Sequence, residues 1–230
     1  NAALLAELPC TDRYCGNFIS TDQFEIILNK VKNTDLYTPV FLAGTMGLRR
    51  SEVLGLRWSD INFETQTMCI QHTVVKCIKD HKITLMFSDV PKTRASRRTL
   101  PLPSGVLRYL KELRRRQCDN YTAHRDKYSR EYLKYICVDD MGLIVKPDDL
   151  SVGFGRIMAE MNFHCRFHDL RHTCASLLVQ HGVELKSVSI WLGHSSIAVT
   201  SDIYTHLTYR EKLKVAETID EYMKDVNVSP

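Results

Sequence analysis

The stretch HDLRHTCASLLVQHGVELKSVSIWLGHSSIAVTSDIY, residues 168–204, decides the expected fold and gathers groups that bind or attack a phosphate. A helix over residues 167–179 would place side chains at the spacing i, i+3 and i+4 on one face. The residues at this spacing are His168, Arg171 and His172, and His194 and Tyr204 follow further along the chain. An apolar stripe lies about a third of a turn away, at about 100° per residue, so the helix both packs and presents polar groups. The stripe consists of Leu170, Cys174, Leu177 and Leu178.

Length and composition are those of a folded globular chain with a small excess of positive charge. Of its 230 residues 44% are hydrophobic, and 31 lysines and arginines stand against 27 acidic residues, giving a net charge of +4. This balance permits a nucleic-acid partner but does not require one. The eight cysteines form no CxxC pair and no apolar run approaches the ~20 residues of a membrane span, so we expect a cytoplasmic protein with reduced thiols. The start at Asn1 suggests a fragment of a longer chain.

Upstream, the segment GLRRSE, which starts at Gly47, lies between two expected helices. The first helix, over Tyr37–Met46, is nearly all apolar and ends at Gly47, and a short helix starts near Ser51. Arg49 therefore lies at a tight junction between helices, where its guanidinium suits a fixed anion ligand. The alternative is that Arg49 and Arg50 only solvate the end of a helix.

Two further charged residues have more than one interpretation. Glu52 follows Arg49 by three residues and either orients its guanidinium or is an acid favoured in the first turn of a helix. Lys92 lies in the turn-like segment PKTRAS. A lone lysine in a loop is a solvated charge in most proteins.

The period of the apolar residues changes to two between Thr67 and Pro101. The runs MCIQHTVVKCI, KITLMF and RRTLPL are rich in Val, Ile and Thr and are separated by the turn-like KDH and PKTRAS, which predicts a small antiparallel sheet of three strands. Helices dominate elsewhere: Ser20 and Gln23 form a capping box, and further helices are expected over residues 104–117, 148–162 and 210–226. The fold class is therefore mainly α with a small antiparallel β-sheet (α+β).

Five motifs, in their order along the chain, resemble the catalytic domain of the tyrosine recombinases, the phage integrase family, and especially the integrases of conjugative transposons. The motifs are GLRRSE with Arg49, PKT with Lys92, HDLRH with His168 and Arg171, LGHSS with His194, and DIYTH with Tyr204. Any one of them is a weak signal, whereas five in order are specific. The resemblance covers nearly the whole chain from about Ser20 onward and implies the tyrosine recombinase catalytic-domain fold.

The resemblance also implies a division of the chain and its partners. Residues 1–19 hold turn formers without a clear period and are expected to be a linker or entry segment, whereas residues 20–207 would form the catalytic domain and residues 208–230 a C-terminal helix. In the family such a helix often docks on a neighbouring protomer, which implies a homotetramer on paired sites in double-stranded DNA. Packing of this helix on its own domain is the alternative. Accessory DNA-bending factors are a further class of partner that the family suggests.

The chemistry implied by the resemblance is cleavage of DNA for the integration and excision of a mobile element. The Tyr204 oxygen attacks a phosphodiester, forms a 3′-phosphotyrosyl link and releases a 5′-hydroxyl. A phenol with a reference pKa of ~10 needs a base or a positive field near neutral pH, and His168 is the expected proton acceptor. Arg49 and Arg171 would clamp the non-bridging oxygens, where negative charge develops. The other roles fall to His194 as a hydrogen-bond donor, Lys92 as the general acid and Glu52 as the buttress of Arg49.

No metal or nucleotide cofactor is implied, because the phosphotyrosyl bond preserves the energy of the bond that it replaces. His172 either belongs to the site or is a structural residue bonded to a backbone carbonyl, and we favour the structural interpretation. The choice of Arg49 over Arg50 rests on the register after Gly47. The sheet is longer than a minimal version, which suggests an extended hairpin, with its tip at Lys79–His81, that contacts DNA or a protein partner.

Three rival interpretations remain. HDLRH resembles the zinc-protease pattern HExxH with Asp169 in place of glutamate, so that His168 and His172 would bind Zn²⁺ in a zinc-dependent hydrolase. That interpretation needs a third ligand and leaves Arg49 and Tyr204 unexplained. A type IB topoisomerase shares the phosphotyrosine chemistry but relaxes supercoils without exchanging partners. A DNA-binding module without catalysis is the third, and the presence of every candidate catalytic residue argues against it.

Overall fold

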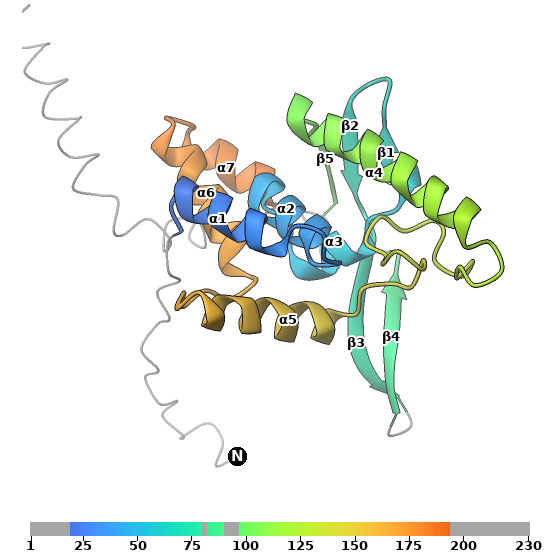
Figure 1. Ribbon diagram of the computed structural model, residues 1–230. Coiled ribbons are helices and arrows are strands. Elements are labelled where there is room, and N and C mark those ends of the chain that lie inside the picture. Colours follow the sequence, from blue (N-terminus) through green and yellow to red (C-terminus); the bar gives the residue numbers. More distant parts are fainter. Residues whose placement is uncertain (1–18, 80–81, 90–96, 194–230) are drawn as a thin grey trace, which may run out of the picture.

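The computed structural model describes residues 19–79, 82–89 and 97–193, and Figure 1 shows a helical body with strands along one side. Its helices are α1 (Thr21–Val31), α2 (Tyr37–Met46), α3 (Arg50–Gly55), α4 (Ser104–Ala123), α5 (Pro147–Glu160), α6 (Asp169–Gln180) and α7 (Leu185–Leu192). Its strands are β1 (Ile61–Asn62), β2 (Thr67–Ile70), β3 (Thr73–Lys79), β4 (Lys82–Ser88) and β5 (Arg98–Pro101). This mixture confirms the expected class, mainly α with antiparallel β-structure. None of the described helices is long and apolar enough to cross a membrane.

Helix α2 lies at the centre of the helical body and contacts α1, α3 and α6. Nearly all of its side chains are apolar and most are buried, as the sequence predicted. It ends at Gly47, whose φ of 68° lies in the left-handed region that glycine adopts without strain, and the Gly47 N–H donates to the carbonyl of Ala43. The chain can therefore turn sharply into α3, and both bounds of α2 confirm the sequence prediction.

Helix α1 begins with the capping box that the sequence predicted. The backbone N–H of Gln23 donates to Oγ of Ser20 at 3.2 Å, and the Gln23 side chain accepts from the N–H of Ser20 at 2.9 Å. These two bonds satisfy donors that have no partner inside the helix. Phe24, Ile27 and Val31 then face the core.

The single three-stranded sheet predicted between Thr67 and Pro101 is wrong. The strands form two sheets, one in the order β1-β2-β5 and the other the hairpin β3-β4. The first predicted strand breaks at Gln71 and His72, because both side chains bond the buried carboxylate of Asp60, each at 2.8 Å. The backbone of His72 also lies against Gly55, where a Cβ atom would approach the His72 carbonyl oxygen to 2.5 Å. These long-range contacts turn the chain out of the first sheet.

The β3–β4 hairpin pairs from Thr73 with Ser88 at its base to Lys79 with Lys82 at its outer end. Figure 1 shows it projecting from the helical body beyond α5, and the Lys76 side chain bonds Asp148 at the start of that helix. The predicted tip at residues 79–81 lies outside the described residues except for Lys79. An extended hairpin is present, and its contact with DNA or a partner stays a prediction.

Candidate active site

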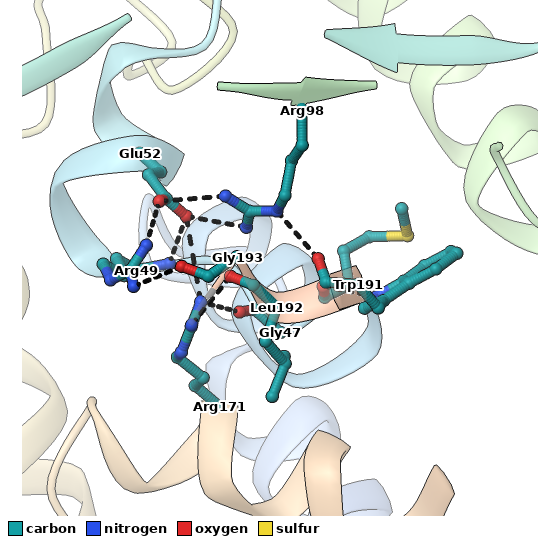
Figure 2. A network of polar contacts seen from close by, with 9 residues as sticks. Gly47, Arg49, Glu52, Arg98, Arg171, Trp191, Leu192 and Gly193 are labelled. Atoms are coloured by element: carbon teal, nitrogen blue, oxygen red, sulfur yellow. Dashed lines mark hydrogen bonds and ion pairs between the residues drawn. The ribbon is translucent and has the colours of Figure 1, made fainter. Parts of the chain in front are cut away.

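Arg171 lies at the centre of the site and is buried, although the sequence predicted a face of α6 that presents it. The residue is 2% exposed. Nη1 donates to the carbonyl of Gly47 at 2.7 Å and Nη2 donates to the carbonyl of Leu192 at 2.8 Å. Arg171 belongs to α6, whereas the two carbonyls belong to the C-cap of α2 and the last turn of α7 (Figure 2). One guanidinium therefore joins three helices.

Arg49 and Glu52 approach Arg171 from the start of α3. Arg49 is the N-cap residue of α3, and its extended backbone places the side chain beside the first turn. Glu52 accepts from Nη1 of Arg49 at 2.7 Å and from the backbone N–H of Arg49 at 2.9 Å. The same carboxylate lies 3.9 Å from Nη1 of Arg171. The predicted pair of arginines and their predicted buttress are thus brought together (Figure 2).

Arg50 points in another direction and lies over α5. Its Nη1 donates to Oγ of Ser151 and to the carbonyl of Pro147. Arg49, and not Arg50, therefore meets Glu52 and Arg171. Beside Arg49 lies a cavity of about 580 Å³, whose lining includes Arg49, Arg50, Arg166 and His168.

Arg98 is a third arginine bonded to the carboxylate of Glu52, and the sequence analysis did not predict it. From β5 its Nη1 and Nη2 donate to Oε1 and Oε2 of Glu52 at 3.1 and 3.0 Å, and its Nε donates to the carbonyl of Trp191 at 2.7 Å. A signal for this placement exists in the sequence. Arg98 and Leu100 lie two residues apart on a strand, and Leu100 is buried, so alternation indicates that Arg98 also faces inward.

The charges of the cluster favour an anion. Burial alone would raise the pKa of the Glu52 carboxyl, but the hydrogen bonds and charges of Arg98 and Arg49 outweigh it and lower the pKa. Burial, followed by the charge of Arg49, lowers the pKa of Arg171 to about 9, so this guanidinium remains protonated at neutral pH. Three guanidinium groups around one carboxylate leave an excess of positive charge, which suits a phosphodiester.

His168 and His172 lie next to each other at the start of α6, with ring centroids 4.9 Å apart. Burial of its ring, followed by the neighbouring His172 and Arg171, lowers the pKa of His168 to about 4. Burial is also the main cause that lowers the pKa of His172. His168 is therefore neutral near pH 7 and able to accept a proton. Within the described ranges, Nδ1 of His172 is buried without a hydrogen-bond partner, so this atom does not make the expected bond to a carbonyl.

The zinc interpretation finds little support in the geometry around the two histidines. Asp169, the residue that would act as general base, is fully buried and accepts bonds from the backbone N–H and the side chain of Arg166 at 2.8 and 3.2 Å. In the part of the chain that the structure describes, no group of three or more His, Cys, Asp or Glu side chains is placed to hold a metal ion. The third ligand that this interpretation requires is thus not found there.

Three predicted residues, Lys92, His194 and Tyr204, lie outside the described residues. Their sequence neighbours nevertheless border the site. Gly193, which precedes His194, accepts a bond from Nη2 of Arg49 at 2.9 Å, and Arg98 follows the segment that contains Lys92. The roles of the three residues remain predictions.

Comparison with known proteins decides the family. Residues 17–211 match the model of the phage integrase family. The chain belongs to the phage integrase family. The resemblance drawn from the five motifs is thereby confirmed, and the chain spans about half the length of the curated family members that it matches.

Two curated relatives illustrate the similarity. A tyrosine recombinase XerC-like protein from Caldanaerobacter subterraneus is 33% identical over 208 residues, which cover 88% of this chain and 53% of that protein. The transposase of transposon Tn916 from Enterococcus faecalis is 25% identical over 179 residues, which cover 75% of this chain and 42% of that protein.

Solved structures of two integrases share the fold. The Tn1549 transposon integrase in complex with transposon right end DNA matches with a TM-score of 0.71 at 21% identity, covering 92% of this chain and 68% of that one. A lambda integrase from a tetramer bound to a Holliday junction matches with a TM-score of 0.61 at 16% identity, covering 86% of this chain and 51% of that one. The predicted tyrosine recombinase catalytic-domain fold is thus confirmed.

Proposed function

We propose that the chain acts as the catalytic domain of a site-specific DNA recombinase, which cleaves and rejoins double-stranded DNA through a 3′-phosphotyrosyl intermediate. The observation that carries the proposal is the convergence of Arg49 and Arg171 on one buried carboxylate, that of Glu52. Two guanidinium groups fixed in this way form a clamp for the non-bridging oxygens of a phosphate. We refer to Arg49, Glu52 and Arg171 as the arginine clamp.

In the proposed cleavage step, a bond forms between the Tyr204 oxygen and phosphorus while the bond to the 5′-oxygen of the DNA breaks. The phenol proton passes to His168, which is neutral near pH 7 because burial lowers its pKa to about 4. A pKa this low makes the free imidazole a weak base, and the negative charge of a bound phosphate would raise this pKa. Lys92 gives a proton to the departing 5′-oxygen, and His194 donates a hydrogen bond to the phosphate. A 5′-hydroxyl from a second strand then reverses the step. One phosphoester replaces another throughout, so the reaction needs neither a metal ion nor a nucleotide.

The proposal extends to partners and biological role. Relatives named as transposases and integrases, and a lambda integrase tetramer on a Holliday junction, support integration and excision of a mobile element by a homotetramer on paired DNA sites. Residues 208–230 would exchange between protomers, residues 1–19 would form a linker or entry segment, and accessory DNA-bending factors would assist. A protein that acts on DNA inside the cell would work in the cytoplasm.

The test is covalent capture of DNA. A pool of duplexes with a randomised centre carries a 5′ label on the strand to be cleaved and a nick close to the cleavage region, so that the short 5′-hydroxyl fragment diffuses away. With EDTA present, we expect the wild-type chain to acquire label that survives denaturing electrophoresis. Tyr204→Phe should bind the same duplexes without acquiring label. The matched control Tyr209→Phe should be labelled like the wild type.

Label on Tyr204→Phe, or none on the wild type, would overturn the proposal. Sequencing the captured DNA identifies a duplex for further assays. Two such duplexes mixed with the wild-type chain should yield recombinant strands. Relaxation of a supercoiled plasmid without strand exchange would instead favour the topoisomerase alternative.

A further inference from the structure

We propose that Arg98 is a positioning residue of the arginine clamp, which holds Glu52 and the last turn of α7 in place without contacting the phosphate itself. This inference rests on the proposed function, because it assigns a role in the same cleavage step. The contacts of Arg98 with two other elements of the fold carry it (Figure 2).

The first contact holds Glu52, which orients Arg49, in place. Arg49 and Glu52 belong to the same short segment, so the pair can move as a unit relative to Arg171. Arg98 comes from β5, a separate element, and engages both carboxylate oxygens at 3.1 and 3.0 Å. A bidentate guanidinium fixes the plane of a carboxylate as well as its position. Arg98 therefore anchors Glu52, and through it Arg49, to the sheet.

The second contact fixes the end of α7. The carbonyls of Trp191, Leu192 and Gly193 are consecutive, and each accepts a bond from a different arginine. Nε of Arg98 donates to the first at 2.7 Å, Nη2 of Arg171 to the second at 2.8 Å and Nη2 of Arg49 to the third at 2.9 Å. Carbonyls at a helix C-terminus lack partners within the helix and carry partial negative charge, which suits cations. Loss of the first bond would loosen the turn on which both clamp arginines rest.

Arg98 is placed as a support and not as a phosphate ligand. All three of its side-chain nitrogens donate bonds within the protein. Its side chain is 8% exposed, compared with 33% for that of Arg49. The cavity beside the clamp is lined by Arg49 but by neither Arg98 nor Arg171, so the bonds made by all three nitrogens of Arg98, and not the cavity, separate its role from that of Arg171. A phosphate in that cavity would therefore meet Arg49, while Arg98 lies behind Glu52.

The test uses the full chain and a duplex captured in the covalent assay. It compares Arg98→Lys, which keeps the charge but loses the planar fork, with Arg98→Gln, which loses both. The matched control is Arg115→Lys on α4, because Arg115 also donates two bonds to one carboxylate, that of Glu112, at 3.1 and 2.6 Å. For each variant we would measure the single-turnover rate of adduct formation, the Kd for the duplex and the thermal unfolding transition.

We expect Arg98→Lys and Arg98→Gln to slow adduct formation by about 10- to 100-fold, because a displaced clamp no longer holds the phosphate in the geometry that the reaction needs. The Kd should change by less than about 3-fold, since a group that touches no phosphate contributes little to ground-state binding. Arg115→Lys should stay within about 2-fold of the wild type in both quantities, as expected for an exposed ion pair. The double variant of Arg98→Gln with Glu52→Gln should be slower than Glu52→Gln alone by less than the factor that Arg98→Gln costs on its own, because the contact between the two residues is shared while the bond to the Trp191 carbonyl is separate.

Wild-type rates in both Arg98 variants would overturn the proposal. Weaker binding of the duplex, with an unchanged rate of adduct formation, would also overturn it. So would a double variant whose rate falls by the product of the two single reductions, because either result would indicate that Arg98 binds phosphate directly. If Arg98→Gln fails to fold, Arg98→Lys and the double variant, in which the buried carboxylate is also removed, still decide the question. Absence of any adduct with the wild type would reject the proposed function and this inference together, whereas failure of the Arg98 predictions alone would leave the proposed function intact.

Discussion

The arginine clamp buries charged side chains, whereas the outer half of the β3–β4 hairpin exposes apolar side chains to solvent. In the clamp, the charged Glu52 and Arg171 are buried, 3% and 2% exposed. In the hairpin, the apolar cross-strand pair Ile78 and Ile83 is 75% and 69% exposed. A buried charge is costly unless it is paired and hydrogen-bonded, whereas an exposed apolar pair costs the fold little. The clamp must therefore be fixed by many partners, while the hairpin end has no such requirement.

The clamp residues are held in place by contacts within the fold, whereas the outer hairpin residues are exposed to solvent. Each clamp residue has at least two hydrogen-bond partners, so one substitution disturbs several contacts. In the part of the hairpin that the structure describes, Ile78 and Ile83 pair with each other in the ladder. Substitutions in the two regions should consequently differ in both size and kind of effect.

The largest effect is expected on catalysis at the clamp. Arg49→Lys should slow adduct formation by about 10²- to 10³-fold, or roughly 3 to 4 kcal/mol at the barrier, because it removes one preorganised donor to the phosphate. Arg50→Lys should cost less than about 10-fold, because Arg50 faces α5 and a lysine keeps its charge. Single-turnover assays on the captured duplex check both values. A larger loss for Arg50→Lys than for Arg49→Lys would show that the register of the motif is wrong.

The sequence predicted best those features that local residues determine. The apolar run before Gly47 and the pair Ser20 and Gln23 fixed the bounds of α2 and the start of α1, because a glycine C-cap and a capping box act within a few residues. The pairing of Arg49 with Glu52 followed from their spacing of three in the same way.

Two features that depend on distant contacts were not predicted, whereas the pairing of Arg49 with Arg171 was implied by the family resemblance. Alternation continues through Gln71 and His72, and the break between the two sheets comes from their bonds to Asp60. Arg98 was missed because its partners, Glu52 and the carbonyl of Trp191, lie far away in the sequence. A sequence pattern shows which side of an element faces inward, but not which groups it meets there.

An intermediate effect is expected on stability where the clamp meets α2. Gly47→Ala should lower the free energy of unfolding by about 1 to 3 kcal/mol, because φ is +68° and a Cβ atom would lie 2.4 Å from Cδ2 of Leu192. Gly105→Ala on α4 is the control, since a Cβ atom there meets nothing within 4 Å, and alanine should be neutral or stabilising by up to about 1 kcal/mol. Denaturant unfolding measures both changes. Equal stability of the two variants would mean that the turn after α2 is not tightly packed against α7.

The smallest effect is expected at the outer end of the hairpin. Replacing both Ile78 and Ile83 by threonine keeps β-branched side chains and should change the free energy of unfolding by no more than about 0.5 kcal/mol, as for other exposed positions. Val74→Thr, at the base of the same strand, is the control, because Val74 is 1% exposed and a buried hydroxyl without a partner costs about 1 to 3 kcal/mol. Denaturant unfolding again provides the measurement. If the double variant lost as much stability as Val74→Thr, the isoleucine pair would belong to the core, and the contrast with the clamp would fail. If the double variant lost no stability, folding would not require isoleucine at these two exposed positions. A contact of the hairpin with another molecule would then have to account for them.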